Sequence, residues 1–202
     1  MRRLVLSVVL TMSILLSSVS AMAITIGFMP ADQIVNVGTP VSVGLTISGL
    51  ADFTAPSLST FDLDVIFNPS ILAFNSVVFG DPVLGDQLVV FGLGGNPTSA
   101  SVTTPGTLNL FELSLDLPDD LNNLQAGSFT LAMLTFNTLA LGTSPLSISI
   151  NALGDALGNP LTADTQGGSV TAVPEPCTLL LISSGLAGVV YLRRRSKPQS
   201  LK

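Results

Sequence analysis

The sequence predicts an all-β protein whose body is an antiparallel β-sandwich of about nine short strands. Residues 41–47 and 61–67 alternate apolar and polar side chains, the period of two that is typical of strands with one buried face. Glycine and proline recur so often that no stretch free of both between 27 and 173 exceeds 14 residues. This leaves little room for helices, and short strands separated by turns are typical of a sandwich.

Residues 1–23 have the order of a secretory signal peptide. Arg2 and Arg3 precede a 13-residue apolar run, and the segment ends in Ala21-Met22-Ala23. We expect export through the secretion translocon and cleavage by signal peptidase after Ala23. A retained membrane anchor is the alternative, but 13 apolar residues fall short of the roughly 20 that span a bilayer.

Residues 24–172 are long enough for one domain with a substantial core. Residues 41–47, 61–67 and 146–150 alternate most clearly, and the other expected strands are apolar runs between turn signals. Between Leu110 and Phe111 the apolar phase slips by one residue, which predicts a β-bulge or a strand that passes between sheets. In chain order, the expected strands are 33–37, 41–47, 61–67, 71–79, 87–91, 107–117, 129–136, 146–150 and 169–172.

The C-terminal segment, residues 173–202, combines a proline motif, an apolar run and a basic tail. Pro174 and Pro176 prevent helix continuation upstream, so we expect a helix over 177–192. Its rise of about 24 Å makes it a marginal transmembrane span. Three arginines open the tail at 193–202 and act as a cytoplasmic stop under the positive-inside rule. They are Arg193, Arg194 and Arg195.

This arrangement resembles the PEP-CTERM sorting signal of Gram-negative bacteria that make exopolysaccharide. The resemblance rests on the short motif, the short helix and the arginine cluster, although Cys177 stands where Ser or Ala is more usual. It implies transient anchorage in the inner membrane and removal of the tail by an exosortase, a membrane-embedded cysteine protease or transpeptidase. Delivery to the cell surface or to the extracellular biofilm matrix would follow. The recognised motif would be Val173, Pro174, Glu175 and Pro176.

Charge is distributed very unevenly along the chain. All seven Lys and Arg lie at the two ends, and none occurs from Leu4 to Leu192. All thirteen Asp and Glu lie in that interval, so its side-chain charge is −13. Nucleic-acid binding is excluded, because it requires cations that displace counterions from phosphates.

The exported segment offers few groups for catalysis, since it contains no His, Lys, Tyr or Cys. Among enzyme classes, only a glycosidase with paired carboxylates has residues to work with. Asp62 and Asp64 share a strand face about 7 Å apart, and Asp116 with Asp119 or Asp120 is a second pair. Alternation alone also places solvated carboxylates on a polar face. We therefore expect a protein that is not an enzyme.

Calcium is the metal that this composition favours, because zinc and copper lack their preferred His and Cys ligands. Two acidic loops, 116–123 and 151–164, hold the possible ligands, but neither has EF-hand spacing, and turn-forming Asp and Asn explain both. We expect no cofactor, with calcium-dependent stability as the alternative. The carboxylates concerned are Asp116, Asp119, Asp120, Asp155 and Asp164.

The body has a second resemblance. The segments FDLDVIFNPSILAF (61–74) and LGDALGNPL (153–161), with the closing GGSVTAV, are similar to the cohesin-type sandwich. This similarity implies a jelly roll over residues 24–172. The sequence therefore leaves two alternative functions. One is a structural surface or matrix protein associated with exopolysaccharide or another surface protein. The other is a cohesin-like module that captures a partner protein or glycan.

Overall fold

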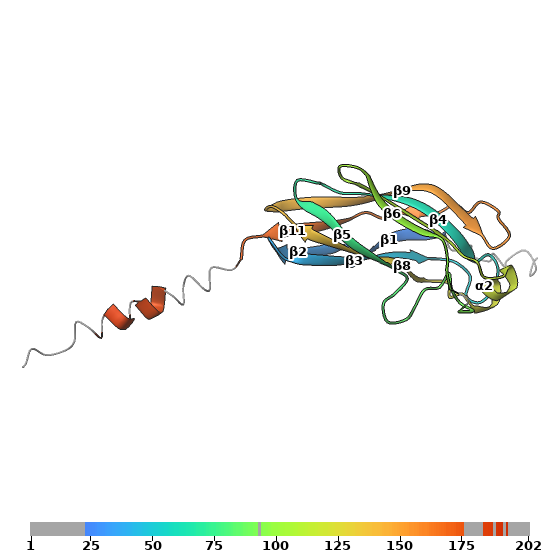
Figure 1. The fold of residues 1–202 in the computed structure, drawn as a ribbon, viewed down its shortest axis with the longest axis horizontal. Coiled ribbons are helices and arrows are strands. Elements are labelled where there is room, and N and C mark those ends of the chain that lie inside the picture. Colours follow the sequence, from blue (N-terminus) through green and yellow to red (C-terminus); the bar gives the residue numbers. More distant parts are fainter. Residues whose placement is uncertain (1–22, 93, 176–183, 188, 192, 194–202) are drawn as a thin grey trace, which may run out of the picture.

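The computed structural model describes residues 23–92, 94–175, 184–187, 189–191 and 193. Within these residues, eleven strands form two stacked sheets, with a short helix at one end (Figure 1). The elements are β1 (Thr25–Met29), β2 (Asp32–Asn36), β3 (Pro40–Ser48), β4 (Leu58–Ile66), β5 (Leu72–Phe79), β6 (Thr98–Thr104), β7 (Thr107–Leu113), α2 (Pro118–Leu124), β8 (Phe129–Thr138), β9 (Gly142–Asp155), β10 (Asp164–Thr165) and β11 (Gly168–Val173).

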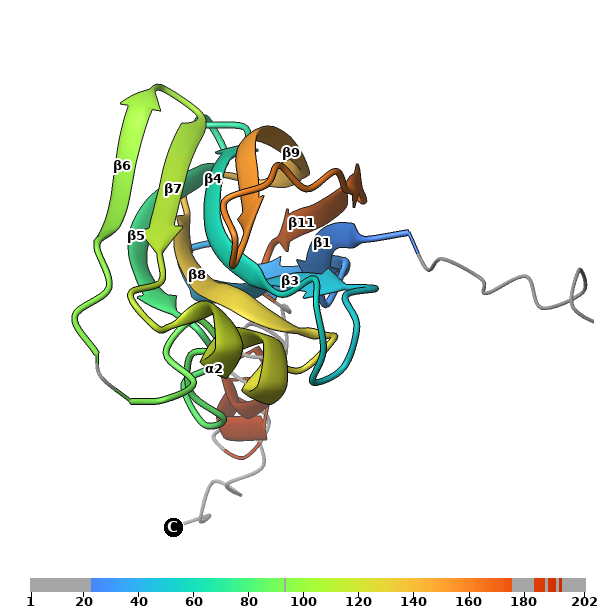
Figure 2. The same cartoon turned by 90° about the vertical axis from the view of Figure 1, so that its right-hand side faces the viewer.

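The two sheets have the orders β10-β1-β3-β8-β5 and β2-β11-β9-β4-β7-β6. Neighbouring strands are antiparallel except in two pairs, β1 with β10 and β2 with β11. The chain thus crosses from one sheet to the other between β1 and β2. The view along the sandwich shows the sheets packed face to face (Figure 2). This confirms the predicted β-sandwich.

The core follows the predicted alternation. Phe61, Leu63 and Val65 of β4 are fully buried, whereas Asp62 and Asp64 face outward. In β3 the buried positions are likewise the apolar members of the alternating pattern. Burial of apolar side chains is the main favourable term in folding. One continuous core therefore lies between the two sheets.

One expected strand, 87–91, is wrong. These residues form turns inside the β5–β6 loop, a name used here for the described residues 80–92 and 94–97. Asp86 Oδ1 accepts a hydrogen bond from the Leu88 N–H, and the Asp86 carbonyl accepts one from the Val89 N–H. Such local bonds compete with strand pairing. Three observed strands, β1, β6 and β10, were not predicted, and β6 lacks the apolar alternation because it is an exposed edge strand.

The bulge or passage between sheets expected near Leu110 is also wrong, since β7 stays in one sheet. β7 pairs with β4 in continuous register from Thr107 to Leu113, and the inward position after Leu110 is occupied by Glu112. The strand ends at Leu113, and residues 118–124 form helix α2 where the sequence predicted only an acidic loop. Pro118 favours a helix start, and carboxylates in the first turn interact favourably with the helix dipole.

The two ends of the chain are described only in part. Ala23 is exposed, while Ala21 and the rest of the expected signal peptide lie outside the described residues. Val173 ends β11 and Glu175 is exposed, whereas Pro176, Arg194 and Arg195 also lie outside. Residues 184–187, 189–191 and 193 are helical. Within the described residues, no helix has the length and apolar character needed to cross a membrane.

Candidate functional site

Four polar side chains form a network on the outer face of β4, β7 and β9. Asn109 Nδ2 donates to Asp62 Oδ1 at 2.7 Å and to Asp64 Oδ1 at 2.9 Å. Asn151 Nδ2 donates to Asp62 Oδ1 at 3.1 Å. The two carboxylates do share one face, as predicted, and the amides hold them in a defined orientation. We call this group of four side chains the carboxylate–amide cluster.

Three of the carboxylates considered for calcium lie near α2. Asp116 is buried, and its Oδ2 accepts a hydrogen bond from the Phe91 N–H at 3.0 Å. Asp119 and Asp120 stand in the first turn of the helix. Asp116 therefore holds the β5–β6 loop, a role that its loop position in the sequence does not reveal.

The other two carboxylates considered for calcium, Asp155 and Asp164, lie on β9 and β10. Asp155 closes a turn at the end of β9, where Oδ1 accepts the backbone N–H groups of Leu157 and Asn159. The side-chain hydrogen bond from Asn159 to Oδ2, helped by these N–H groups, keeps the pKa of Asp155 below its ordinary value. Asp164 is exposed in β10. The described residues contain no group of three or more His, Cys, Asp or Glu side chains placed to hold a metal. Calcium-dependent stability stays a prediction.

Among the described residues, the most deeply buried carboxyl group is that of Glu112, which the sequence did not indicate as a site residue. Its side chain has 0% exposure, and Oε1 accepts a hydrogen bond from Asn96 Nδ2 at 3.0 Å. Burial, and then the neighbouring carboxyl of Asp86, raise the pKa of Glu112 to about 8. The available signal was the alternation itself, because Glu112 follows Leu108 and Leu110 at the same spacing.

Ser114 and Asp116 follow Glu112 at the same spacing of two residues, and both hold the β5–β6 loop. Ser114 Oγ donates to the Leu88 carbonyl at 2.6 Å, and Asp116 binds the Phe91 N–H. Leu88 is fully buried and belongs to the core. The loop therefore closes one end of the sandwich.

Gln125 also connects elements at this end of the sandwich. It is 2% exposed, and its Oε1 accepts the Leu58 N–H while its Nε2 donates to the carbonyls of Leu58 and Gln87. Buried polar groups that keep all their partners rigidify a fold. α2, β4 and the β5–β6 loop are thus joined through one side chain.

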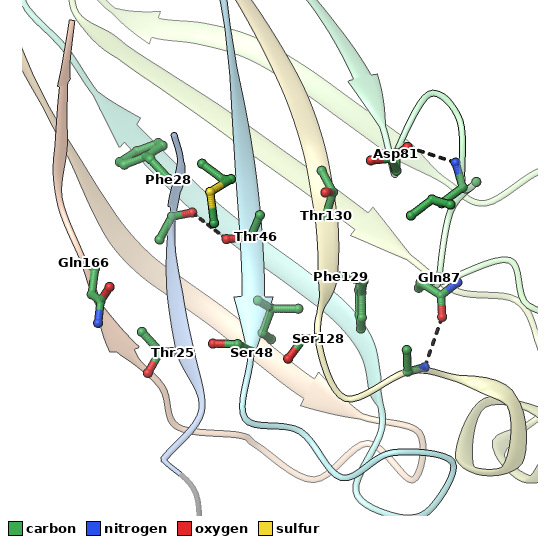
Figure 3. Close-up of a pocket in the computed structure, with 16 residues that line it drawn as sticks. Thr25, Phe28, Thr46, Ser48, Asp81, Gln87, Ser128, Phe129, Thr130 and Gln166 are labelled. Carbon is green, nitrogen blue, oxygen red and sulfur yellow. Dashed lines mark hydrogen bonds between the residues drawn. The ribbon is translucent and has the colours of Figure 1, made fainter. Parts of the chain in front are cut away.

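A groove of about 460 Å³ lies on the outer face of the other sheet, beside the same loop. Thr25, Thr46, Ser128 and Thr130 line its floor, and Gln87 lies on the loop side (Figure 3). Gln87 Oε1 accepts a hydrogen bond from the Ala126 N–H, as the dashed line in Figure 3 shows. The groove has hydroxyl and amide groups and one carboxylate, Asp81. Its loop wall depends on how the β5–β6 loop is held.

Comparison with known proteins identifies two features. Residues 172–195 match the PEP-CTERM protein-sorting motif. No curated protein sequence matches the chain. Solved structures with a similar fold include cohesins, and their low sequence identity to this chain makes the similarity one of fold alone.

Three of these structures illustrate the similarity. The sixth cohesin of scaffoldin B from Acetivibrio cellulolyticus, solved in complex with a dockerin, has a TM-score of 0.57 at 20% identity, over 75% of this chain and 99% of that one. A non-cellulosomal cohesin from Archaeoglobus fulgidus has a TM-score of 0.53 at 16% identity, over 77% and 94%. The cohesin module of a family 33 glycoside hydrolase from Clostridium perfringens has a TM-score of 0.56 at 15% identity, over 77% and 98%.

These findings confirm both resemblances that the sequence indicated. The sorting motif shows that the protein is exported, transiently anchored in the membrane and then directed to the surface. The chain therefore combines a cohesin-like β-sandwich with a C-terminal PEP-CTERM sorting signal.

Proposed function

We propose that this protein is a non-enzymatic binding module that an exosortase releases to the cell surface or the extracellular matrix. The observation that carries this proposal is the position of the sorting motif, which begins at residue 172 inside β11. Val173 still pairs with Asn36 of β2, and its carbonyl accepts the Val37 N–H. Processing near Pro176 would therefore release the sandwich with its last strand complete.

The partner is proposed to bind at the carboxylate–amide cluster. Asp62 and Asp64 are partly exposed on the outer face of β4. The asparagine side chains hold the Oδ1 atom of each carboxylate by hydrogen bonds, Asn109 on both and Asn151 on Asp62. No cation occurs in residues 24–173 to neutralise these carboxylates. A partner that supplies Lys or Arg would complement them and gain charge-assisted hydrogen bonds. The dockerin complex of a structurally similar cohesin supports a protein as the partner.

Replacing Pro174, Glu175 and Pro176 together with alanine tests the sorting step. We expect the wild-type protein from the medium to end near Pro176, and the triple variant to keep Lys202 and remain in the membrane fraction. Intact mass and peptide mapping give the answer. An Asp- or Glu-directed protease is required, because no Lys or Arg lies between Arg3 and Arg193.

The Leu157→Ala variant is the control for sorting, since Leu157 is 72% exposed and lies outside the motif. It should be processed like the wild type. A wild-type chain that retains Lys202 in cells with an active exosortase would contradict the proposed release.

The Asp62→Lys, Asp64→Lys double variant tests the partner surface. We expect it to lose at least about tenfold in retention of matrix components on a column, because two attractive contacts become repulsive. Retention by the wild type should also weaken as salt is added. The control is Ser42→Lys with Thr135→Lys, a cross-strand pair on the other sheet that gains the same two lysine side chains without the loss of two carboxylates. Equal retention by the two double variants would exclude the carboxylate–amide cluster as the binding surface.

A further inference from the structure

The most unusual buried group is the Glu112 carboxyl, which lies between the core and the β5–β6 loop. Its Oε1 binds Asn96, while Oε2 is fully buried and accepts no hydrogen bond from an N–H or hydroxyl group of the described residues. The neighbouring side chain is the carboxyl of Asp86. The backbone of Asp86 packs closely against Gly80, where an added Cβ would lie 2.5 Å from the Asp86 Cα. Two carboxyl groups therefore meet with no N–H between them.

The carboxyl of Glu112 is buried and that of Asp86 is half-buried, and two carboxylates in such contact repel each other unless a proton or a cation lies between them. The orientation of Asn96 decides between the two. Its Oδ1 accepts the Leu115 N–H, and its Nδ2 donates to the Leu88 carbonyl, so the amide cannot be turned around. The NH₂ group therefore faces Glu112, where it would repel a metal ion and hydrogen-bond a carboxyl oxygen. A proton fits this site and a cation does not.

We propose that Glu112 and Asp86 share one proton and form a latch, which docks the β5–β6 loop at neutral pH and releases it in alkaline solution. Glu112 donates through Oε2 to Asp86, and the pair carries a single negative charge. Loss of the proton leaves two facing carboxylates, one of them fully buried. Outward movement of the loop relieves this repulsion, because Asp86 belongs to the loop and Glu112 to β7.

Other ionisable groups near Glu112 act on different contacts. Among the described side chains, Asp86 contributes the charge that acts on Glu112. Asp116 binds the Phe91 N–H farther along the loop, and Asp62 and Asp64 face the opposite side of β4. Thr98, which pairs with Glu112 from β6, has no charge.

Release of the loop would change two surfaces at once. Leu88 would leave the core, which it now shares with the two sheets. Leu84, Gly85 and Gln87 would no longer form the loop wall of the groove. The latch thus makes the groove sensitive to pH.

The chain is well suited to a direct test, because Glu112 and Glu175 are its only glutamates. In the full chain, kept in detergent micelles and labelled with ¹³C at the glutamate carboxyl carbon, we expect two signals. That of Glu112 is assigned by its loss in the Glu112→Gln variant. It should keep the chemical shift of a protonated carboxyl past pH 7 and move near pH 8. A Glu112 signal that is already that of a carboxylate at pH 6 would overturn the proposal.

Amide hydrogen exchange tests the release itself. Between pH 6 and pH 9 we expect the protection factors of the Leu88 and Phe91 amides to fall at least about tenfold. In the Glu112→Gln variant, the side-chain amide donates to Asp86 at every pH, so protection should change less than about twofold. Equal protection at both pH values in the wild type would overturn the latch even if Glu112 titrates as expected.

The Asp86→Asn variant keeps the proposal testable if Glu112→Gln does not fold. Removing the facing carboxylate should move the Glu112 titration to lower pH, since a permanent donor replaces the shared proton. An unchanged midpoint would show that Asp86 has no part in holding the proton, and would overturn the pair.

Discussion

We expect the Phe136→Ala variant to lose about 3–5 kcal/mol of unfolding free energy, the range typical of a large core aromatic replaced by alanine. Phe136 has 0% exposure and stands in β8, between β3 and β5. Its ring centroid lies 5.1 Å from that of Phe67 and 6.1 Å from that of Phe74, both in edge-on arrangements. Alanine removes both ring contacts and leaves a cavity that two hydrogen-bonded neighbouring strands cannot close. Urea denaturation measures the difference.

Phe91→Ala is the matched control for this prediction. Phe91 is 61% exposed, and its hydrogen bond to Asp116 is made by the backbone N–H, which alanine keeps. Its unfolding free energy should change by less than about 0.5 kcal/mol. A loss below about 1 kcal/mol for Phe136→Ala would contradict the central position of this ring in the core.

We expect the free energy of unfolding to fall as the pH rises from about 4.5 to about 8. The pKa of Glu112 is raised from 4.5 to about 8 in the folded state, so the folded chain binds more protons than the unfolded chain across this window. The stabilisation is fully present below pH 4.5 and is lost as the pH rises through the folded pKa. A shift of this size corresponds to a loss on the order of 5 kcal/mol.

Urea denaturation at a series of pH values provides the measurement, with Glu112→Gln as the matched control. The control should show a nearly flat profile across this range, because residues 24–173 contain no His, Cys, Lys or Tyr that would titrate there. Parallel profiles for the two proteins would refute the assignment to Glu112.

At acidic pH, two other carboxyl groups make the free energy of unfolding fall as the pH is lowered. Backbone N–H groups of Leu84 and Val83 lower the pKa of Asp81, and Asn159 lowers that of Asp155. Their contributions are present above the ordinary value of 3.8 and are lost as the pH falls below it. Stability should therefore be greatest near pH 4.5.

Much of the fold could be predicted because it depends on local patterns. The alternation in 41–47 and 61–67 correctly placed β3 and β4, since a period of two separates a buried from an exposed face whatever the neighbouring strands are. The sorting motif was equally evident, because it is a contiguous stretch whose order of residues carries the signal. The same alternation correctly predicted that Asp62 and Asp64 share a face, but not that Asn109 and Asn151, from two other strands, bind them.

The errors occurred where tertiary contacts override local preference. Residues 87–91 have the composition of a strand, yet Asp86 turns the chain and Leu88 is drawn into the core. Glu112 interrupts an apolar pattern, which predicted a bulge, because a carboxylate is costly to bury. Asp86 and Asn96, 26 and 16 positions away in the chain, supply the partners that make this burial possible.

The sequence by itself determined the sandwich class, the inward faces of the central strands, the absence of cations from the body and the C-terminal sorting signal. The tertiary structure alone decided how the end of the sandwich is closed, with Glu112, Ser114 and Asp116 holding the β5–β6 loop. The physical reason is the range of the interactions. Periodicity and motifs act over a few neighbouring residues, whereas the protonation of a buried carboxyl depends on which distant side chain the fold places against it.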